Sequence, residues 1–319
     1  MHCDVSPLLY EVYGFSYCLP MAEFHQIAGY DVVATLGEGA ASKLYRVRDK
    51  HGKEFCLKRV VKDNAKQQRF IDQAVTEYEV SKSLDSPLIR KVHKFIRQRA
   101  LLRTSEVLVL MELVEGKTLE QIRFSGMVSF CKLFHAAAKA LKCMHDAGYV
   151  HADIKPNNIM VTSDGSIKLI DFGQSCKNGT VKERIQGTPD YIAPEQVKRQ
   201  PITPKTDMFN LGATMYWLLT GERVPTMMPR KDRGDTIQLR TDDSKKTIQS
   251  PIELVPECPP ALSNLLLDCV AKAPADRPDH MQMVMDRVEI AAGQAKRAMA
   301  EQNAANEGSS IENGALAEK

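Results

Sequence analysis

The chain from Tyr30 onward begins with short apolar stretches separated by glycines and polar residues. These stretches cover residues 32–36, 44–47 and 55–60, and such a pattern predicts short strands joined by turns. The strands are expected to form an antiparallel sheet. Residues 107–111 make another brief apolar run in which valine alternates with other side chains, as in a buried strand.

Helical patterns follow these strands. Residues 65–84 contain neither glycine nor proline, which predicts a helix that ends at the turn Asp85-Ser86-Pro87. After Gly116 the apolar positions recur every three or four residues, as on one face of a helix that ends near Gly148. These positions are Phe130, Leu133, Phe134, Ala137, Leu141 and Met144. Residues 209–219 and 262–270 predict further helices.

The order of these elements predicts an α+β fold with two lobes. A strand-rich lobe covers about residues 29–113, a helix-rich lobe covers about 117–290, and residues 112–117 join them as a hinge. Residues 1–28 match no periodic pattern and are expected to be an N-terminal extension, with Met21 as an alternative native start. Residues 291–319 carry few large apolar side chains, so they are expected to form a disordered tail. Within this tail, the Ala-rich residues 291–300 favour a helix.

Charge and composition exclude several classes of protein. The 319 residues include 43 Lys and Arg against 40 Asp and Glu, so the formal charge of +3 does not favour nucleic acid or an anionic membrane as the main partner. No apolar run approaches the roughly 18 residues of a membrane span. The eight cysteines include no Cys-x-x-Cys pair, which favours reduced thiols and a cytoplasmic location. The oligomeric state is left open.

A glycine-rich stretch lies between the first two predicted strands. Small side chains there allow backbone N–H groups to approach a phosphate closely, although a hairpin that needs glycines in its turn gives the same pattern. The stretch consists of Leu36, Gly37, Glu38, Gly39, Ala40, Ala41, Ser42, Lys43 and Leu44. The next predicted strand places one cation, Lys58, among apolar residues, and such a lysine alone is usually a surface residue.

Two later segments concentrate the groups that phosphoryl transfer needs. The first contains Asp153, Lys155 and Asn158, and the second is Asp171-Phe172-Gly173, directly after the apolar residues 167–170. Two carboxylates and a carboxamide in adjoining loops provide an acceptor for a hydroxyl proton and oxygen ligands for Mg²⁺.

The motifs, continued by Gly187-Thr188-Pro189 and Ala193-Pro194-Glu195, resemble those of the eukaryotic-type (Hanks-type) protein kinases in type and order. The resemblance covers roughly residues 30–290. It implies the bilobal protein kinase fold with ATP and Mg²⁺ as cofactors. The Ala-Pro-Glu segment favours a protein substrate, while Lys155 and the Gly-Thr-Pro segment resemble serine/threonine kinases and not tyrosine kinases.

The resemblance also implies a role for each catalytic residue. Asp153 would orient the substrate hydroxyl and accept its proton as the catalytic base. Lys155 would neutralise the transferring phosphoryl group, and Asn158 and Asp171 would ligate Mg²⁺.

The nucleotide site follows from the same resemblance. Lys58 would hold the α- and β-phosphates and pair with a glutamate of the next helix, for which the spacing to Pro87 favours Glu77 over Glu79. The other residues implied around ATP are Leu44, Cys56, the gatekeeper Met111, the hinge residues Glu112 and Val114, and Met160.

Further motif residues would have structural roles. Glu195 would form a buried ion pair with Arg277, and Asp207 would brace the backbone of the catalytic loop. Lys177, Lys182 and Arg184 would either select acidic substrates or belong to a solvated loop.

Two positions depart from the family pattern. Ser42 replaces the third glycine of the phosphate loop, a change that the small serine allows. Ala152 replaces the arginine that precedes the catalytic aspartate in most regulated kinases, so the chain resembles the non-RD variant. Because that arginine binds a phosphate on the activation segment, activity is expected not to depend on phosphorylation of Ser175 or Thr180.

Other functions stay open at the level of the sequence. A pseudokinase that binds nucleotide or a partner without catalysis is one alternative, and a small-molecule phosphotransferase is another. The short activation segment resembles bacterial members of the family.

Overall fold

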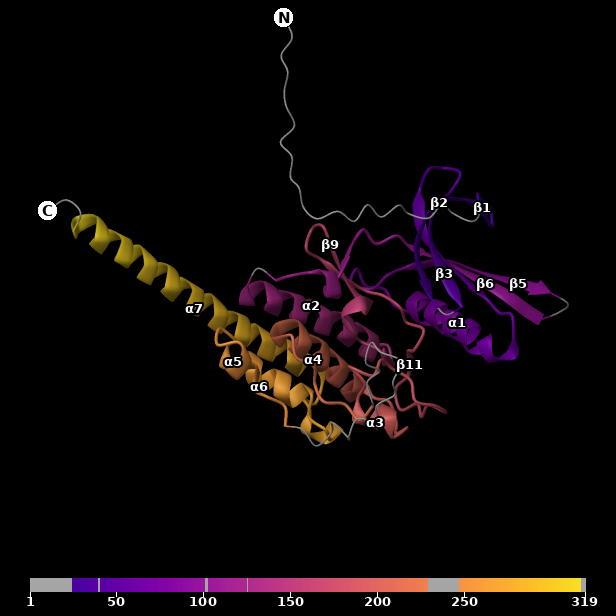
Figure 1. The fold of residues 1–319 in the computed structure, drawn as a ribbon. Coiled ribbons are helices and arrows are strands. Elements are labelled where there is room, and N and C mark those ends of the chain that lie inside the picture. The colour runs from indigo at the N-terminus through magenta and orange to yellow at the C-terminus, as the bar shows by residue number, and fades with distance from the viewer. Residues whose placement is uncertain (1–24, 40, 101–102, 125, 229–246, 317–319) are drawn as a thin grey trace, which may run out of the picture.

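The computed structural model describes residues 25–316 apart from 40, 101–102, 125 and 229–246. The strand-rich first part forms one lobe, and the helices of the second part form the other (Figure 1). This arrangement confirms the predicted bilobal α+β fold. Within the described ranges, no helix combines the length and the apolar character needed to cross a membrane.

The first lobe is built on an antiparallel sheet with the strand order β1-β2-β3-β4-β6-β5. The chain reaches helix α1 (Gln68–Lys82) through a 3-10 turn at Ala65–Gln67. The side of the sheet that includes Cys56 packs on α1. The strands are β1 (Gln26–Ile27), β2 (Tyr30–Gly39), β3 (Ser42–Arg48), β4 (Glu54–Val61), β5 (Val92–Ala100) and β6 (Arg103–Glu112).

Alternation along β4 determines which side of the sheet Lys58 occupies. Leu57 belongs to a core with Tyr45 on one side, whereas Cys56 and Val60 belong to the core that includes α1. Because successive side chains of a strand point to opposite faces, Lys58 shares the side of Cys56 and Val60. The sequence therefore directs its ammonium group toward α1.

The second lobe surrounds α4 (Pro204–Thr220), which is apolar on nearly all sides and largely buried. Helix α2 (Met127–Asp146) packs along α7 (Met281–Leu316), and α6 (Pro260–Cys269) packs against both α4 and α7. The shorter elements are β7 (Gly116–Thr118), β8 (Tyr149–Val150), β9 (Ile159–Thr162), β10 (Ile167–Leu169), β11 (Cys176–Lys177), α3 (Pro194–Val197), α5 (Pro251–Leu254) and 3-10 turns at Leu119–Gln121, Pro156–Asn158 and Pro274–Asp276.

Two short sheets support the loops of this lobe. Strand β9 pairs with β7 and with β10, and β8 pairs with β11. Asp153 lies in the loop after β8, and Asp171 lies in the segment after β10. The pairings of these short strands therefore support the two segments that carry the carboxylates.

Both ends of the described chain differ from the predicted boundaries. Ile27 of β1 lies in a core of the sheet, so this lobe includes residues that the sequence placed in the extension; residues 1–24 lie outside the described ranges. Helix α7 continues to Leu316, although the sequence predicted a largely disordered tail after residue 290. Ala291 and Ala295 are buried, which anchors the helix beyond that point, and Ala, Gln and Glu favour its extension. Its yellow end projects away from the lobes in Figure 1.

Candidate active site

Lys58 forms an ion pair with Glu77 of helix α1. The distance from Lys58 Nζ to Glu77 Oε2 is 2.7 Å, and the Glu77 side chain has no exposed surface. Glu77, and not Glu79, is therefore the partner, as the sequence spacing favoured. Burial alone would lower the pKa of Lys58, but the carboxylates of Glu77 and Asp171 raise it above its ordinary value, so the ammonium group stays charged.

Asp171 lies close to the same lysine. Its Oδ1 atom is 3.7 Å from Lys58 Nζ, and the residue is partly buried, whereas Glu77 is fully buried. The backbone φ of 64° lies in the left-handed region, which aspartate adopts more readily than most residues. Burial would raise the pKa of Asp171, but Lys58, Arg90 and Lys155 lower it below its ordinary value and favour the ionised carboxylate.

Asp153 is held by residues from its own loop and from the activation segment, which runs from Asp171 to Glu195. Thr188 Oγ1 donates a hydrogen bond of 2.8 Å to Asp153 Oδ1, and Lys155 Nζ lies 3.2 Å from Asp153 Oδ2. Lys155 also donates to Thr188 Oγ1 at 3.0 Å. Asn158 Nδ2 donates to the backbone oxygen of Asp153 at 2.8 Å. The structure thus brings Asp153, Lys155 and Asn158 together and adds Thr188, which the sequence did not place in the site.

The catalytic loop rests on Asp207 of α4. The buried Asp207 carboxylate accepts hydrogen bonds from the backbone nitrogens of His151 and Ala152 at 2.8 and 2.7 Å. Its Oδ2 atom also lies 2.8 Å from His145 Nε2. Beside this loop the ring of Phe172 contacts His151 in an edge arrangement with centroids 5.5 Å apart.

A second buried contact ties the activation segment to the end of the second lobe. Arg277 donates from both terminal nitrogens to the Glu195 carboxylate at 2.7 and 2.9 Å, and both side chains are buried. The bidentate geometry suits a fixed structural link between the two segments.

The glycine-rich stretch lies beside Lys58. Leu36, Gly37, Glu38 and Gly39 belong to β2, Ala41 lies in the turn, Ser42, Lys43 and Leu44 begin β3, and Ala40 lies outside the described residues. Leu44 is opposite Lys58 in the register of β3 and β4, while Leu36 is 49% exposed. Backbone amides of this hairpin and the lysine ammonium therefore share one region.

The residues implied for the adenine ring occupy strands on both sides of the hinge. Cys56 is opposite Met111 in neighbouring strands, and both are buried. Glu112 ends β6, Val114 lies in the connection to β7, and Met160 lies in β9 opposite Thr118 of β7. β7 and β9 thus place Met160 next to the segment that joins the lobes.

Residues 30–288 match the protein kinase domain family. The chain belongs to the protein kinase family. Similar curated proteins include a probable serine/threonine-protein kinase of Clostridium acetobutylicum, at 34% identity over 56% of this chain and 28% of that protein. The serine/threonine-protein kinase PknA of Mycobacterium tuberculosis is 28% identical over 77% of this chain and 56% of its own length. Another is the mouse sperm motility kinase 2B, at 33% identity over 63% of this chain and 41% of that protein. The chain thus spans between about a quarter and little more than half of the length of these relatives.

Protein kinases use ATP and Mg²⁺, and the donor set of this kinase fits both. The Asn158 amide nitrogen is engaged by Asp153, so its oxygen is the atom that can face a cation. The ionised Asp171 supplies a second hard oxygen ligand of the kind that Mg²⁺ prefers. Lys58 supplies a charged donor for phosphate oxygens on the same side.

Two contacts of this kinase site could not be predicted from the sequence. Gln196 of α3 donates to the backbone oxygens of Ala152 and Gln186 at 2.8 and 3.2 Å, so it joins the catalytic loop to the activation segment. Arg90 donates to Glu77 Oε1 at 2.8 Å. Neither residue lies in a sequence pattern that marks it as buried.

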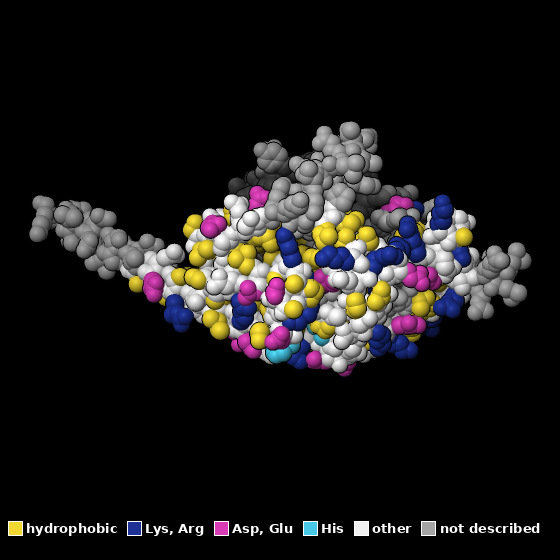
Figure 2. Space-filling view, turned by 90° about the horizontal axis from the view of Figure 1, so that it is seen from below, with side chains coloured by type: hydrophobic (Ala, Val, Ile, Leu, Met, Phe, Trp, Pro, Cys, Tyr) yellow, Lys and Arg dark blue, Asp and Glu magenta, His cyan; other side chains and the backbone are white. Residues whose placement is uncertain are grey.

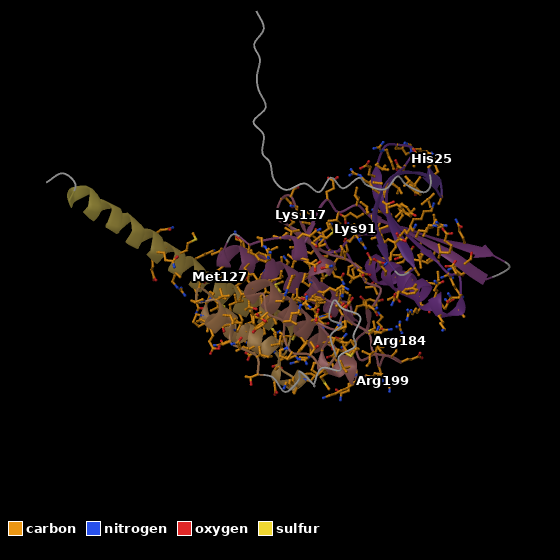
Figure 3. The ribbon with its side chains drawn as sticks, viewed as in Figure 1. His25, Lys91, Lys117, Met127, Arg184 and Arg199 are labelled. Atoms are coloured by element: carbon orange, nitrogen blue, oxygen red, sulfur yellow. The ribbon has the colours of Figure 1, made fainter. Side chains whose placement is uncertain are left out.

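Basic residues also lie on the activation segment and just beyond α3. Lys182 Nζ donates to the Gln174 backbone oxygen at 2.8 Å, and Arg199 NH1 donates to that of Glu183 at 3.1 Å. Figure 3 places Arg184 and Arg199 near each other at the edge of the second lobe. Figure 2, seen from below, shows acidic side chains interspersed among Lys and Arg.

Proposed function

We propose that this kinase transfers the γ-phosphoryl group of ATP to serine and threonine hydroxyls of protein substrates. The observation that carries the proposal is the contact of Asp153 with both Thr188 and Lys155. It joins a carboxylate base, a cation and the activation segment in one arrangement. The names of the relatives as serine/threonine-protein kinases support the same acceptor class.

Each side chain has a defined task in this proposal. Asp153 orients the acceptor hydroxyl and takes its proton as the oxygen attacks phosphorus. Lys155, within 3.2 Å of that carboxylate, stabilises the negative charge on the transferring group. Thr188 fixes the rotamer of Asp153 through its 2.8 Å hydrogen bond.

The nucleotide is held by the opposite side of the site. Lys58, oriented by Glu77, binds the α- and β-phosphates, and the hairpin of β2 and β3 covers the phosphates with backbone amides. Asn158 and Asp171 hold Mg²⁺, which when bound neutralises phosphate charge. Leu44, Cys56, Met111, Glu112, Val114 and Met160 are the proposed contacts of the adenine ring.

The proposal includes independence from activation-segment phosphorylation. Ala152 is buried beside Val150 and Ile202, an apolar setting without the arginine that would bind a phosphate there. The catalytic loop is instead linked to the activation segment by the Gln196 amide and by the Thr188 hydroxyl, and neither contact needs a modification.

A cytoplasmic location belongs to the same proposal. The described cysteines, Cys56, Cys131, Cys143, Cys176, Cys258 and Cys269, are free thiols. Free thiols persist in reducing compartments. Fractionation of cells that produce the tagged chain tests this location, and recovery from an oxidising compartment contradicts it.

The test of function is phosphorylation of a generic basic protein with radiolabelled ATP and Mg²⁺, followed by analysis of the phosphorylated amino acids. The wild type should form phosphoserine or phosphothreonine, and Asp153→Asn should not. Asp146→Asn on exposed α2 is the matched control and should behave as the wild type. ATP binding without label from any variant indicates a pseudokinase. Label on small molecules but not on proteins indicates a small-molecule phosphotransferase.

A further inference from the structure

Arg90 is a second cation on the Glu77 carboxylate. Its terminal nitrogen NH2 donates to Glu77 Oε1 at 2.8 Å, while Lys58 Nζ contacts the other oxygen, Oε2, at 2.7 Å. Glu77 is fully buried and Arg90 is 8% exposed. Each oxygen of one carboxylate is therefore matched to its own cation.

The backbone of residue 90 links α1 to the second lobe. Ser81, one turn beyond Glu77 on α1, donates from Oγ to the Arg90 backbone oxygen at 2.6 Å. The Arg90 backbone nitrogen donates to Leu169 of β10 at 3.0 Å, and the Leu169 nitrogen donates to Leu88 at 2.8 Å. Because Asp171 follows β10 directly, these bonds position α1 relative to the strand that leads to Asp171.

The segment Asp171-Phe172-Gly173 contacts the same helix. A Cβ atom placed on Gly173 would lie 3.3 Å from Gln73 Cβ and 3.4 Å from the Gln73 backbone oxygen of α1. A side chain at residue 173 would require a shift of a few tenths of an ångström in α1 or in this segment. The segment that carries Asp171 therefore packs directly on α1.

The two cations on Glu77 differ in their other tasks. Lys58 also lies 3.7 Å from Asp171 and, in the proposed function, contacts phosphates, so several anions share its charge. Among the ion pairs of the described residues, Arg90 contacts only Glu77. Its planar guanidinium donates in a fixed geometry. A buried carboxylate left without a cation is strongly destabilised, and Arg90 provides Glu77 with a cation that does not depend on Lys58.

We propose that Arg90 is a positioning residue that holds Glu77, and with it α1, in the phosphate-binding arrangement independently of Lys58 and of nucleotide. The catalytic consequence rests on the proposed kinase function. The role of Arg90 would also explain the proposed independence from phosphorylation, because an α1 that is anchored to β10 does not need a phosphorylated activation segment to hold it.

The test is hydrogen exchange of the α1 amides, residues 68–82, in the full chain without nucleotide. We compare the wild type with Arg90→Met, which removes the charge at similar length, Arg90→Lys, which keeps it, and Lys58→Met. Exchange in α1 should be faster by about tenfold or more in Arg90→Met. It should stay near the wild-type rate in Lys58→Met and be intermediate in Arg90→Lys. An α1 that is unchanged in Arg90→Met, or loosened as much or more by Lys58→Met, overturns the proposal.

Two further measurements separate this role from general stability and from catalysis. Exchange in α6 reports on global unfolding and should not change; an equal increase there overturns the local role. If Arg90→Met does not fold, Arg90→Gln keeps an amide donor for Glu77 and should still accelerate exchange in α1. In kinetics, Arg90→Met should lower kcat by about tenfold with the KM for peptide unchanged, and Arg90→Lys should restore most of it. Hydrogen exchange does not require catalytic activity, so it tests the role of Arg90 even if the chain proves not to phosphorylate proteins.

Discussion

Asp207 accepts a hydrogen bond of 2.7 Å from the backbone nitrogen of Ala152, a residue with a φ of 62°. This left-handed conformation is unfavourable by roughly 1–2 kcal/mol for a residue with a Cβ atom. The buried carboxylate therefore holds the loop in a conformation that it would not adopt alone. Asp153 is the next residue, so its position opposite Thr188 depends on a side chain of α4.

The first prediction concerns Asp207→Asn. Asparagine has the same shape, but its amide group offers one acceptor oxygen for two backbone N–H donors, so the loop should shift. A displacement of about 1 Å at the reacting groups lowers the rate by about 100-fold, and we expect a fall in kcat of about 10- to 100-fold. The KM for ATP should change little because Lys58 and Glu77 lie on other elements. Initial rates at varied ATP and peptide concentrations measure both.

The matched control for Asp207→Asn is Asp146→Asn, on the exposed surface of α2, where kcat should be unchanged. A variant of Asp207 with normal kcat would show that the loop keeps its conformation without both hydrogen bonds.

The second prediction is that Ser175→Ala and Thr180→Ala leave kcat within a few-fold. Ser175 is buried and its Oγ donates to the His151 backbone oxygen at 3.4 Å, while Thr180 Oγ1 donates to the Lys177 backbone oxygen at 2.6 Å. Both hydroxyls thus have local partners, and Ala152 supplies no cation to bind a phosphate. The rates of the variants are compared with those of wild-type protein incubated with ATP and Mg²⁺, and mass spectrometry records the phosphorylation of each sample. A loss of about 100-fold, equal to about 2.7 kcal/mol, would refute this view.

Thr188→Ala provides the contrast within the same segment. Because Thr188 contacts both Asp153 and Lys155, its removal should lower kcat by at least about tenfold. Similar rates for all three alanine variants would mean that the segment does not position Asp153.

The third prediction concerns Gln196, whose side chain is buried and fully used. Its amide nitrogen donates to Ala152 and Gln186, and its Oε1 accepts from the Ala193 backbone nitrogen at 2.9 Å and from Asn210 Nδ2 at 3.0 Å. Gln196→Leu leaves these groups without partners and should lower the free energy of unfolding by roughly 2–3 kcal/mol. Urea denaturation measures this, with Gln200→Leu on the exposed surface as the control.

A small effect of Gln196→Leu, equal to that of Gln200→Leu, would contradict the buried network. A full effect on stability with normal kcat would confine the role of Gln196 to folding and would leave the ordering of the activation segment to other contacts.

Local periodicity predicted the two lobes. The resemblance to the protein kinases, together with the spacing to Pro87, predicted the pairing of Lys58 with Glu77. The buried contacts of Arg90 and Gln196 could not be predicted, because arginine and glutamine are usually exposed. Here they are buried by residues that are distant in the sequence. Strand β1 has two residues, too few to show alternation. The extension of α7 depends on the burial of Ala291 against the second lobe, which composition does not indicate.

The last prediction concerns the pH dependence of stability and Asp171. Burial alone would raise the pKa of this carboxyl. The attraction of Lys58 and the neighbouring cations outweighs that effect, so the pKa lies below its ordinary value of 3.8. A carboxyl with a lowered pKa in the folded state stabilises the fold at pH values above its unfolded pKa. That stabilisation is lost as the pH falls through the folded pKa. The wild type should therefore be more stable than Asp171→Asn at pH 7, by an amount that stays constant to about pH 5 and shrinks below about pH 4.

Asparagine also adopts the left-handed backbone, so the variant keeps the local conformation. Urea denaturation at pH 7, 5, 4 and 3.5 gives this difference, and Asp85→Asn at an exposed turn corrects for the general effect of acid. A difference that persists unchanged as far as the protein remains folded would mean that the stabilisation does not come from the ionised Asp171 beside Lys58.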